Sequence, residues 1–145
     1  LLEKSPFDLS GGQKRRVAIA GVMAMKPKVL ILDEPCASLD PASRNQILAM
    51  IKEYHNKTNA TILIVSHSME DMAEFSDRIL VMNKGRVFCF DENKKVFAKA
   101  EELVSIGLQV PQISRVFMTL NSMGYNLGNA YTISNAIEVL KHRLL

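Results

Sequence analysis

The sequence LILDEP, from Leu30 to Pro35, follows Val29 and brings a run of apolar residues directly into two adjacent carboxylates. An apolar run of this length is typical of a strand buried on both faces, as in a parallel sheet covered by helices. Ligands bind at the carboxyl ends of such strands, where Asp33 and Glu34 stand. Because neighbouring strand residues point to opposite faces, one acid can hold Mg²⁺ while the other orients or deprotonates a water. The alternative is a strand end with two solvated acids.

Composition places the chain among ordinary globular proteins. Its 145 residues, 48% hydrophobic and 23% charged, suffice for one domain with a core. The net charge of +3 is too small to indicate a nucleic-acid or anionic-membrane surface. No apolar run reaches the length of a membrane span, and no signal-peptide pattern opens the sequence. Cys36 and Cys89 follow no metal-ligand spacing and fit a reduced compartment.

A glycine-rich helix start precedes the LILDEP strand. Ser10 is placed to cap a helix that Pro27 ends, and the first turn of this helix holds Gly11, Gly12 and Gln13. Glycine weakens a helix by roughly 1 kcal/mol relative to alanine. The missing side chains can let backbone N–H groups approach an anion; the alternative is a plain turn with no ligand. Small residues at three- and four-residue spacing then present a narrow face: Val17, Ala20, Gly21 and Ala24.

Helices and strands continue to alternate after LILDEP. Asp40 and Pro41 combine an N-cap acid with a proline at the first helical position, which predicts a helix to about His55. A second buried strand is expected at 61–65 and ends at Ser66 and His67, and Ser68 can cap the next helix. Residues 79–90 are typical of a β-hairpin. The inward residues of the helix that follows Pro41 are expected to be Ile47, Leu48 and Ile51.

The character of the sequence changes from Asp91 onward. Helices are predicted at about 94–106, 111–123 and 133–144, and Thr132 is placed to cap the last one. Val116, Leu120 and Met123 form a stripe that serves either as a dimer face or as part of a core.

Four motifs together resemble those of ABC-type ATPases. Residues 9–13, LSGGQ, look like the signature motif, and 29–34 look like the Walker B strand with its following glutamate. Ser38-Leu39-Asp40 is similar to the D-loop, and His67 falls at the place of the switch histidine. Each motif alone is weak, but the order and spacing of all four are specific. The resemblance covers about residues 9–90 and implies an α/β fold, the C-terminal part of a P-loop NTPase domain.

The resemblance also implies roles for individual residues in ATP hydrolysis. Asp33 would bind Mg²⁺ through water, and Glu34 would orient or deprotonate the attacking water. His67 would contact the γ-phosphate and that water; otherwise it is a satisfied polar residue at a strand end. Asp40 would lie at a dimer seam. The signature residues Ser10, Gly11, Gly12 and Gln13 would bind the γ-phosphate of ATP held by a second subunit.

Parts of the family pattern are missing. No GxxxxGK[ST] occurs in the 145 residues, so the loop that cradles the β- and γ-phosphates is missing. The glutamine loop and the nucleotide-stacking strand expected upstream of the signature are missing as well. Because the sequence also starts at Leu1 without an initiator Met, we expect it to be a piece of a longer subunit. The chain alone is expected neither to bind ATP tightly nor to hydrolyse it.

The C-terminal part resembles the extension of energy-coupling factor ATPases, which power vitamin and metal-ion importers. The resemblance rests on three segments: 106–112, 123–125 and 131–138. It implies a partial ABC ATPase domain at 1–92 and a helical extension at 93–145 that helps two ATPase subunits pair. It further implies a transmembrane coupling subunit as partner, no nucleic acid, no direct membrane insertion, and a peripheral location on the cytoplasmic face of the membrane. The alternative is a generic amphipathic tail.

Two further functions stay open at this point. One is a soluble ABC ATPase of DNA repair or translation, which would show coiled-coil arms, a second cassette or basic surfaces; this sequence shows none of them. The other is a catalytically silent dimerisation fragment.

Overall fold

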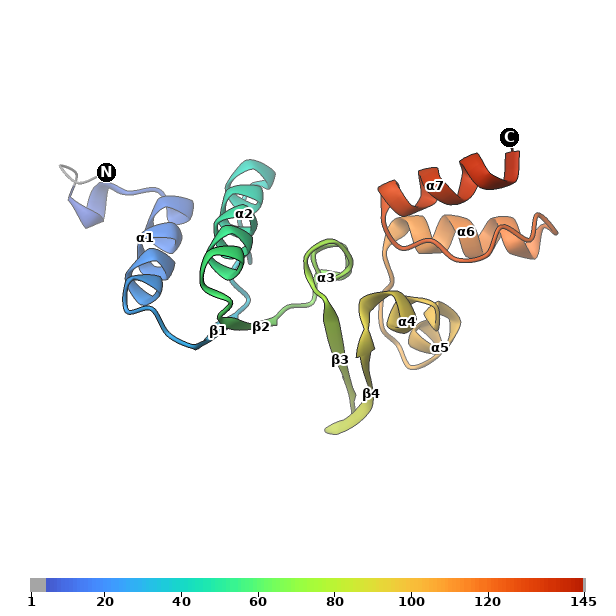
Figure 1. Ribbon diagram of the computed structural model, residues 1–145, viewed down its shortest axis with the longest axis horizontal. Helices are drawn as coiled ribbons and strands as arrows, with labels where there is room; N and C mark the ends of the chain where they lie inside the picture. The colour runs from blue at the N-terminus through green and yellow to red at the C-terminus, as the bar shows by residue number, and fades with distance from the viewer. Residues whose placement is uncertain (1–4, 145) are drawn as a thin grey trace. The chain divides into compact units, whose positions relative to one another are not determined.

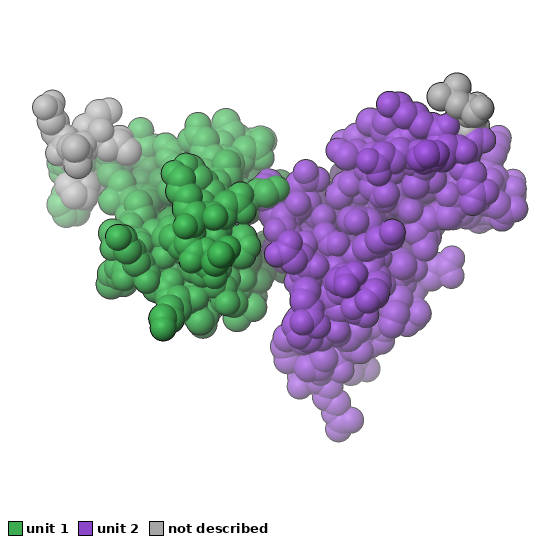
Figure 2. Space-filling view, in the orientation of Figure 1, with its two compact units in different colours: residues 1–67 green, residues 68–145 purple. Residues whose placement is uncertain are grey.

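The computed structural model describes residues 5–144 (Figure 1). The chain divides into two compact units, and the boundary falls between His67 and Ser68 (Figure 2). All residues for which the sequence predicts a role in ATP hydrolysis lie in unit 1, up to His67.

Unit 1 is a two-stranded parallel sheet with helices on one face. Strand β1 (Val29–Asp33) pairs in parallel with β2 (Thr61–Val65), so that Asp33 lies opposite Val65. Helices α1 (Gly11–Ala24) and α2 (Pro41–Thr58) run side by side, and a short 3₁₀ turn, η1 (Pro6–Asp8), precedes them (Figure 1). The core joins residues from both helices and one sheet face: Ile19, Met23, Leu30, Leu32, Ile47 and Ile51. The predicted α/β class with parallel strands and flanking helices is confirmed.

The opposite face of this sheet is open, which corrects one prediction. Val29 is 57% exposed and Ile31 is 64% exposed, and Leu63 and Val65 in β2 are 49% exposed each. Burial therefore alternates along β1. The expectation that both strands are buried on both faces is wrong for this structure, because within unit 1 the helices cover a single face.

The helices of unit 1 begin where the sequence predicts and end differently. Ser10 caps α1 and Asp40 caps α2, as expected. Helix α2 continues to Thr58, past the predicted end at His55, because Asn59 supplies the left-handed C-cap at φ +52°. The predicted inward residues of α2 are all buried: Ile47, Leu48 and Ile51. In α1 the small-residue face is exposed, and the packed residues are Gly12, Ile19 and Met23.

Unit 2 begins with α3 (Met69–Phe75), which Ser68 caps as predicted. The predicted hairpin forms from β3 (Arg78–Asn83) and β4 (Arg86–Glu92). The helix predicted over 94–106 is instead two short helices, α4 (Asn93–Phe97) and α5 (Ala100–Ser105). The break at Lys99 turns apolar residues of both helices inward: Val96, Phe97, Ala100 and Leu103.

The last two helices, α6 (Gln112–Ser122) and α7 (Ile133–Leu144), share a small core. Its buried members are Phe117, Leu127, Ala130 and Ala136. The Thr132 hydroxyl accepts a hydrogen bond from the Asn135 N–H at 3.2 Å, as expected of a cap. The predicted stripe on α6 divides, since Leu120 packs against this core while Val116 and Met123 are exposed. Among the described residues, no helix is long and apolar enough to cross a membrane.

Candidate functional site

Glu34 and His67 meet at the carboxyl end of the parallel strands. The strand ladder continues one step past β1, because the Glu34 N–H donates to the Val65 carbonyl at 2.8 Å. Glu34 then takes a left-handed conformation at φ +45°, which ends the strand. Its Oε1 accepts a hydrogen bond from the His67 backbone N–H at 3.1 Å and lies 2.7 Å from His67 Nδ1. The structure thus pairs the two residues predicted to be catalytic.

The pairing has a chemical consequence for the imidazole. A carboxylate oxygen only accepts, so the contact requires the proton on Nδ1. In the neutral ring, Nε2 is then an acceptor. To donate to a phosphate through Nε2 at the same time, His67 must be an imidazolium. The His67 side chain is 83% exposed and the Glu34 side chain 34%, so a ligand can reach both.

Asp33 is exposed beside this pair. In the part of the chain described, no group of three or more His, Cys, Asp or Glu side chains could hold a metal ion. Mg²⁺, however, is commonly held by one or two carboxylates, water and substrate phosphates. The single exposed carboxylate of Asp33 fits that kind of coordination.

The start of α1 is a complete capping box. The Ser10 hydroxyl accepts from the Gln13 N–H at 3.3 Å, and the Gln13 Oε1 accepts from the Ser10 N–H at 3.0 Å. Gln13 therefore stabilises the start of α1. A Cβ on Gly11 would meet nothing within 4 Å. The first turn is accordingly open to solvent at Gly11, as an anion site there requires.

Gly12 is buried for a different reason. A Cβ at Gly12 would lie 2.7 Å from the Ser43 Oγ, so α1 and α2 approach as closely as they do only because the residue is glycine. Ser43 in turn donates its backbone N–H to Asp40 Oδ1 at 2.9 Å. Hydrogen bonds from the Ser43 side chain and backbone lower the pKa of Asp40 from its ordinary value.

The predicted residues therefore form two groups. Glu34 and His67 are in direct contact, while Ser43 joins Gly12 to Asp40. Among the described residues, no hydrogen bond or ion pair connects one group to the other. The sequence analysis did not single out Ser43. Its position three residues after the N-cap aspartate Asp40 is the signal that its backbone N–H donates to the capping carboxylate.

The chain is similar to ATP-binding proteins of ABC transporters. Residues 1–37 match the family model described as ABC transporter. Nearly the whole chain, 95% of it, is 54% identical to the energy-coupling factor transporter ATP-binding protein EcfA2 of Clostridium perfringens. It is 44% identical over 143 residues to the EcfA2 protein of Streptococcus agalactiae. The chain corresponds to a fragment of an ABC transporter ATPase.

Solved structures of ABC transporter proteins share the fold of this chain. CbiO1 of Clostridium perfringens, part of the ABC transporter complex CbiONQ, matches 81% of the chain with a TM-score of 0.63 and 39% identity. An inward-facing putative metal-chelate ABC transporter matches 71% with a TM-score of 0.66 and 26% identity. The chain covers 46% and 40% of those two structures. It likewise spans about half the length of the curated relatives, 49% and 51% for the two EcfA2 proteins.

Proposed function

We propose that this chain is part of the ATP-binding subunit of an energy-coupling factor-like importer. The subunit couples ATP hydrolysis to the uptake of a vitamin or a metal ion. The observation that supports this most directly is the Glu34–His67 contact at the carboxyl end of β1 and β2. The relatives named EcfA2 support the type of transporter.

Glu34 and His67 act on the water that attacks the γ-phosphate. In phosphoryl transfer the protein mainly positions groups and stabilises charge. The two hydrogen bonds from His67 hold one Glu34 oxygen in place, which orients the carboxylate as a base. His67 then contacts the γ-phosphate through its exposed ring. Asp33 holds Mg²⁺ through water, and the bound ion neutralises charge on the phosphates.

The signature turn serves a second subunit. Ser10, Gly11, Gly12 and Gln13 bind the γ-phosphate of ATP held by that subunit, through the first backbone N–H groups of α1. Asp40 lies at the seam between the subunits and couples the two sites. Ser43 bonds to Asp40 and lies close to Gly12, so the starts of α1 and α2 move together at the seam.

The remaining assignments follow from the same proposal. Residues 1–92 belong to the ATPase domain, and 93–145 form an extension that helps two ATPase subunits pair, identical or paralogous. A transmembrane subunit couples them to transport, and the complex lies peripherally on the cytoplasmic face of the membrane. Because the sequence has no Walker A motif, the chain alone does not hydrolyse ATP.

The test uses a hybrid subunit in which this chain replaces the matching 139 residues of the Clostridium perfringens EcfA2 protein. In this hybrid, Glu34→Gln lowers ATP turnover about a hundredfold or more and leaves ATP binding nearly unchanged. Glu74→Gln, a change at an exposed acid on α3, leaves both unchanged. Normal turnover in Glu34→Gln would exclude Glu34 as the base.

A second assay separates the catalytic role from a dimerisation fragment. The 145-residue chain is assayed alone and after mixing with an intact ATPase subunit. No turnover alone and a change in the partner's turnover on mixing are expected. Turnover by the chain alone contradicts the proposal.

A further inference from the structure

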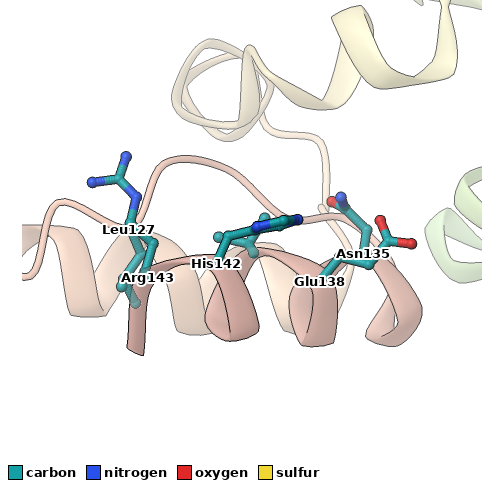
Figure 3. Close-up of a pocket in the computed structure, with 6 residues that line it drawn as sticks. Leu127, Asn135, Glu138, His142 and Arg143 are labelled. Atoms are coloured by element: carbon teal, nitrogen blue, oxygen red, sulfur yellow. The ribbon is translucent and has the colours of Figure 1, made fainter. Parts of the chain in front are cut away.

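Helices α6 and α7 and the loop between them hold together as a pair. The residues of their shared core, and those that pack against it, fall between Ile113 and Leu140. The Ser114 hydroxyl donates to the Ala130 carbonyl at 2.8 Å, which keeps the end of the loop beside the first turn of α6. Leu127 of the same loop lines a hollow along α7 (Figure 3). The pair therefore moves as one body.

Helix α6 begins without a cap of its own. The first N–H groups of a helix have no partner within the helix. Pro111 occupies the N-cap position of α6 and makes no side-chain hydrogen bond there. The start of α7, by contrast, is capped by the Thr132 hydroxyl. The start of α6 therefore depends on an acceptor from another part of the chain.

Glu70 on α3 supplies this acceptor. Its Oε1 accepts a hydrogen bond from the Gln112 N–H at 3.4 Å, across 42 positions of sequence. The helix dipole also favours a carboxylate at this end of a helix. The other end of α3 is tied to the start of α4, where the Asn93 amide donates to the carbonyls of Ala73 and Ser76. Glu70 belongs to the proposed ATPase domain and Gln112 to the proposed extension, so their bond crosses the boundary between the two.

The other contacts of the pair leave it room to move. The Tyr131 ring stacks on the buried Phe97 ring, with 5.8 Å between the centroids. The Asn129 amide donates to the Ala98 carbonyl at 3.4 Å. Both of these last residues line a hollow of about 280 Å³, which lies between the start of α5 and the Met118 side of α6. Close-packed interiors leave few voids larger than a water molecule, so the pair is not sealed against α5.

We propose that Glu70 is a latch for the α6–α7 pair. Its bond to Gln112 holds the pair in one orientation on α3, and loss of this bond frees the pair to turn about the stack of Tyr131 on Phe97. One contact fixes a position, whereas a second contact is needed to fix an orientation. In the proposed function the extension pairs two ATPase subunits, so Glu70 is a positioning residue for that pairing. This last step rests on the proposed function, and the latch itself does not.

Hydrogen exchange of the Gln112 amide, followed by NMR in the 145-residue chain, tests the bond. Glu70→Ala removes the acceptor and is expected to speed this exchange about threefold or more. Glu70→Gln keeps an acceptor oxygen and gives a rate between those of the wild type and Glu70→Ala. Glu74→Ala, at an exposed acid on the same helix, leaves the rate unchanged. An unchanged rate in Glu70→Ala overturns the proposal.

The orientation of the pair is measured by the distance between two spin labels, at Glu74→Cys on α3 and Met123→Cys at the end of α6. Both sites are exposed, and the native Cys36 and Cys89 are replaced by serine. The distribution of distances is expected to be narrow with Glu70 present and broader in Glu70→Ala, because the second fixing contact is lost. An equally narrow distribution in Glu70→Ala overturns the latch, even where the amide exchanges faster.

Pairing of the hybrid subunits tests the last step. In sedimentation with ATP, Glu70→Ala is expected to raise the Kd of pairing about threefold or more, because only a fraction of the freed pairs is oriented to bind. Glu70→Gln lies nearer the wild type, and Glu74→Ala equals it. If Glu70→Ala frees the pair in both earlier measurements and the Kd stays the same, the latch is supported and the role of the extension in pairing is wrong.

Discussion

The Glu34 carboxylate takes two hydrogen bonds from the same residue, His67, through a single oxygen. One donor is the His67 backbone N–H at 3.1 Å, and the other is its ring at 2.7 Å. The two residues are 33 positions apart, and the parallel pairing of β1 and β2 brings them together, because each follows the end of one strand. The pair behaves as one unit: the backbone of one strand end fixes the side chain of the other.

This unit predicts non-additive kinetics. In the hybrid subunit, Glu34→Gln and His67→Ala each lower ATP turnover, and the double variant is about as slow as the slower single variant, because residues that act together do not contribute independently. A double-variant cycle on turnover measures the coupling. Fully additive losses, whose logarithms sum, would show that the contact has no part in turnover.

Gly12 and Gly11 differ in what a side chain would meet. Gly12→Ala places a new Cβ 2.7 Å from the Ser43 Oγ and 3.0 Å from the Ser43 Cβ. We therefore expect the free energy of unfolding, measured with urea, to fall by about 1–3 kcal/mol. Gly11→Ala meets nothing within 4 Å and adds helix propensity, so stability stays equal or rises by up to about 1 kcal/mol. Equal stability of the two variants contradicts the tight approach of α1 to α2.

Most helix and strand starts and the meeting of Glu34 with His67 could be predicted from the sequence. Helix starts at Ser10 and Asp40 follow from local capping chemistry, which needs no tertiary information. The contact of Glu34 with His67 follows from placing both at strand ends of a parallel pair. These features are local or depend on strand direction alone.

Burial and helix breaks could not be predicted in the same way. A uniformly apolar run such as Val29–Leu32 does not distinguish a strand covered on one face from one covered on two. The break at Lys99 carries no glycine or proline, and Phe97 and Leu103 on either side of it are both buried. The contact of Gly12 with Ser43 depends on how two helices cross, which the pattern of either helix alone does not contain.

Asp40 predicts a specific dependence of stability on pH. Because hydrogen bonds from Ser43 lower its pKa below 3.8, the ionised cap stabilises the folded chain above that value. This contribution is lost as the pH falls through the lower, folded-state pKa. Asp40→Asn can still cap but does not titrate. The difference in melting temperature between wild type and Asp40→Asn should be constant above about pH 5 and should change below about pH 4. A difference that does not vary with pH contradicts the lowered pKa.

The open face of the β1–β2 sheet predicts self-association of the 145-residue chain. Ile31 and Leu63 pair across the sheet on the exposed side, with exposed fractions of 64% and 49%. Exposed apolar surface beside unpaired strand edges favours contact with another chain. Sedimentation of wild type should give a mass above that of a monomer, and Ile31→Lys with Leu63→Lys should lower it.

The control for this prediction is Val104→Lys, which changes an apolar residue of 44% exposure on α5. It removes the same kind of surface in unit 2 and should leave the mass unchanged, because Val104 is not part of the open sheet face. A wild-type chain that sediments as a monodisperse monomer and melts cooperatively would show that the face does not cause association. A mass lowered equally by Val104→Lys would assign the contact to unit 2, since only the sheet variants act on β1 and β2.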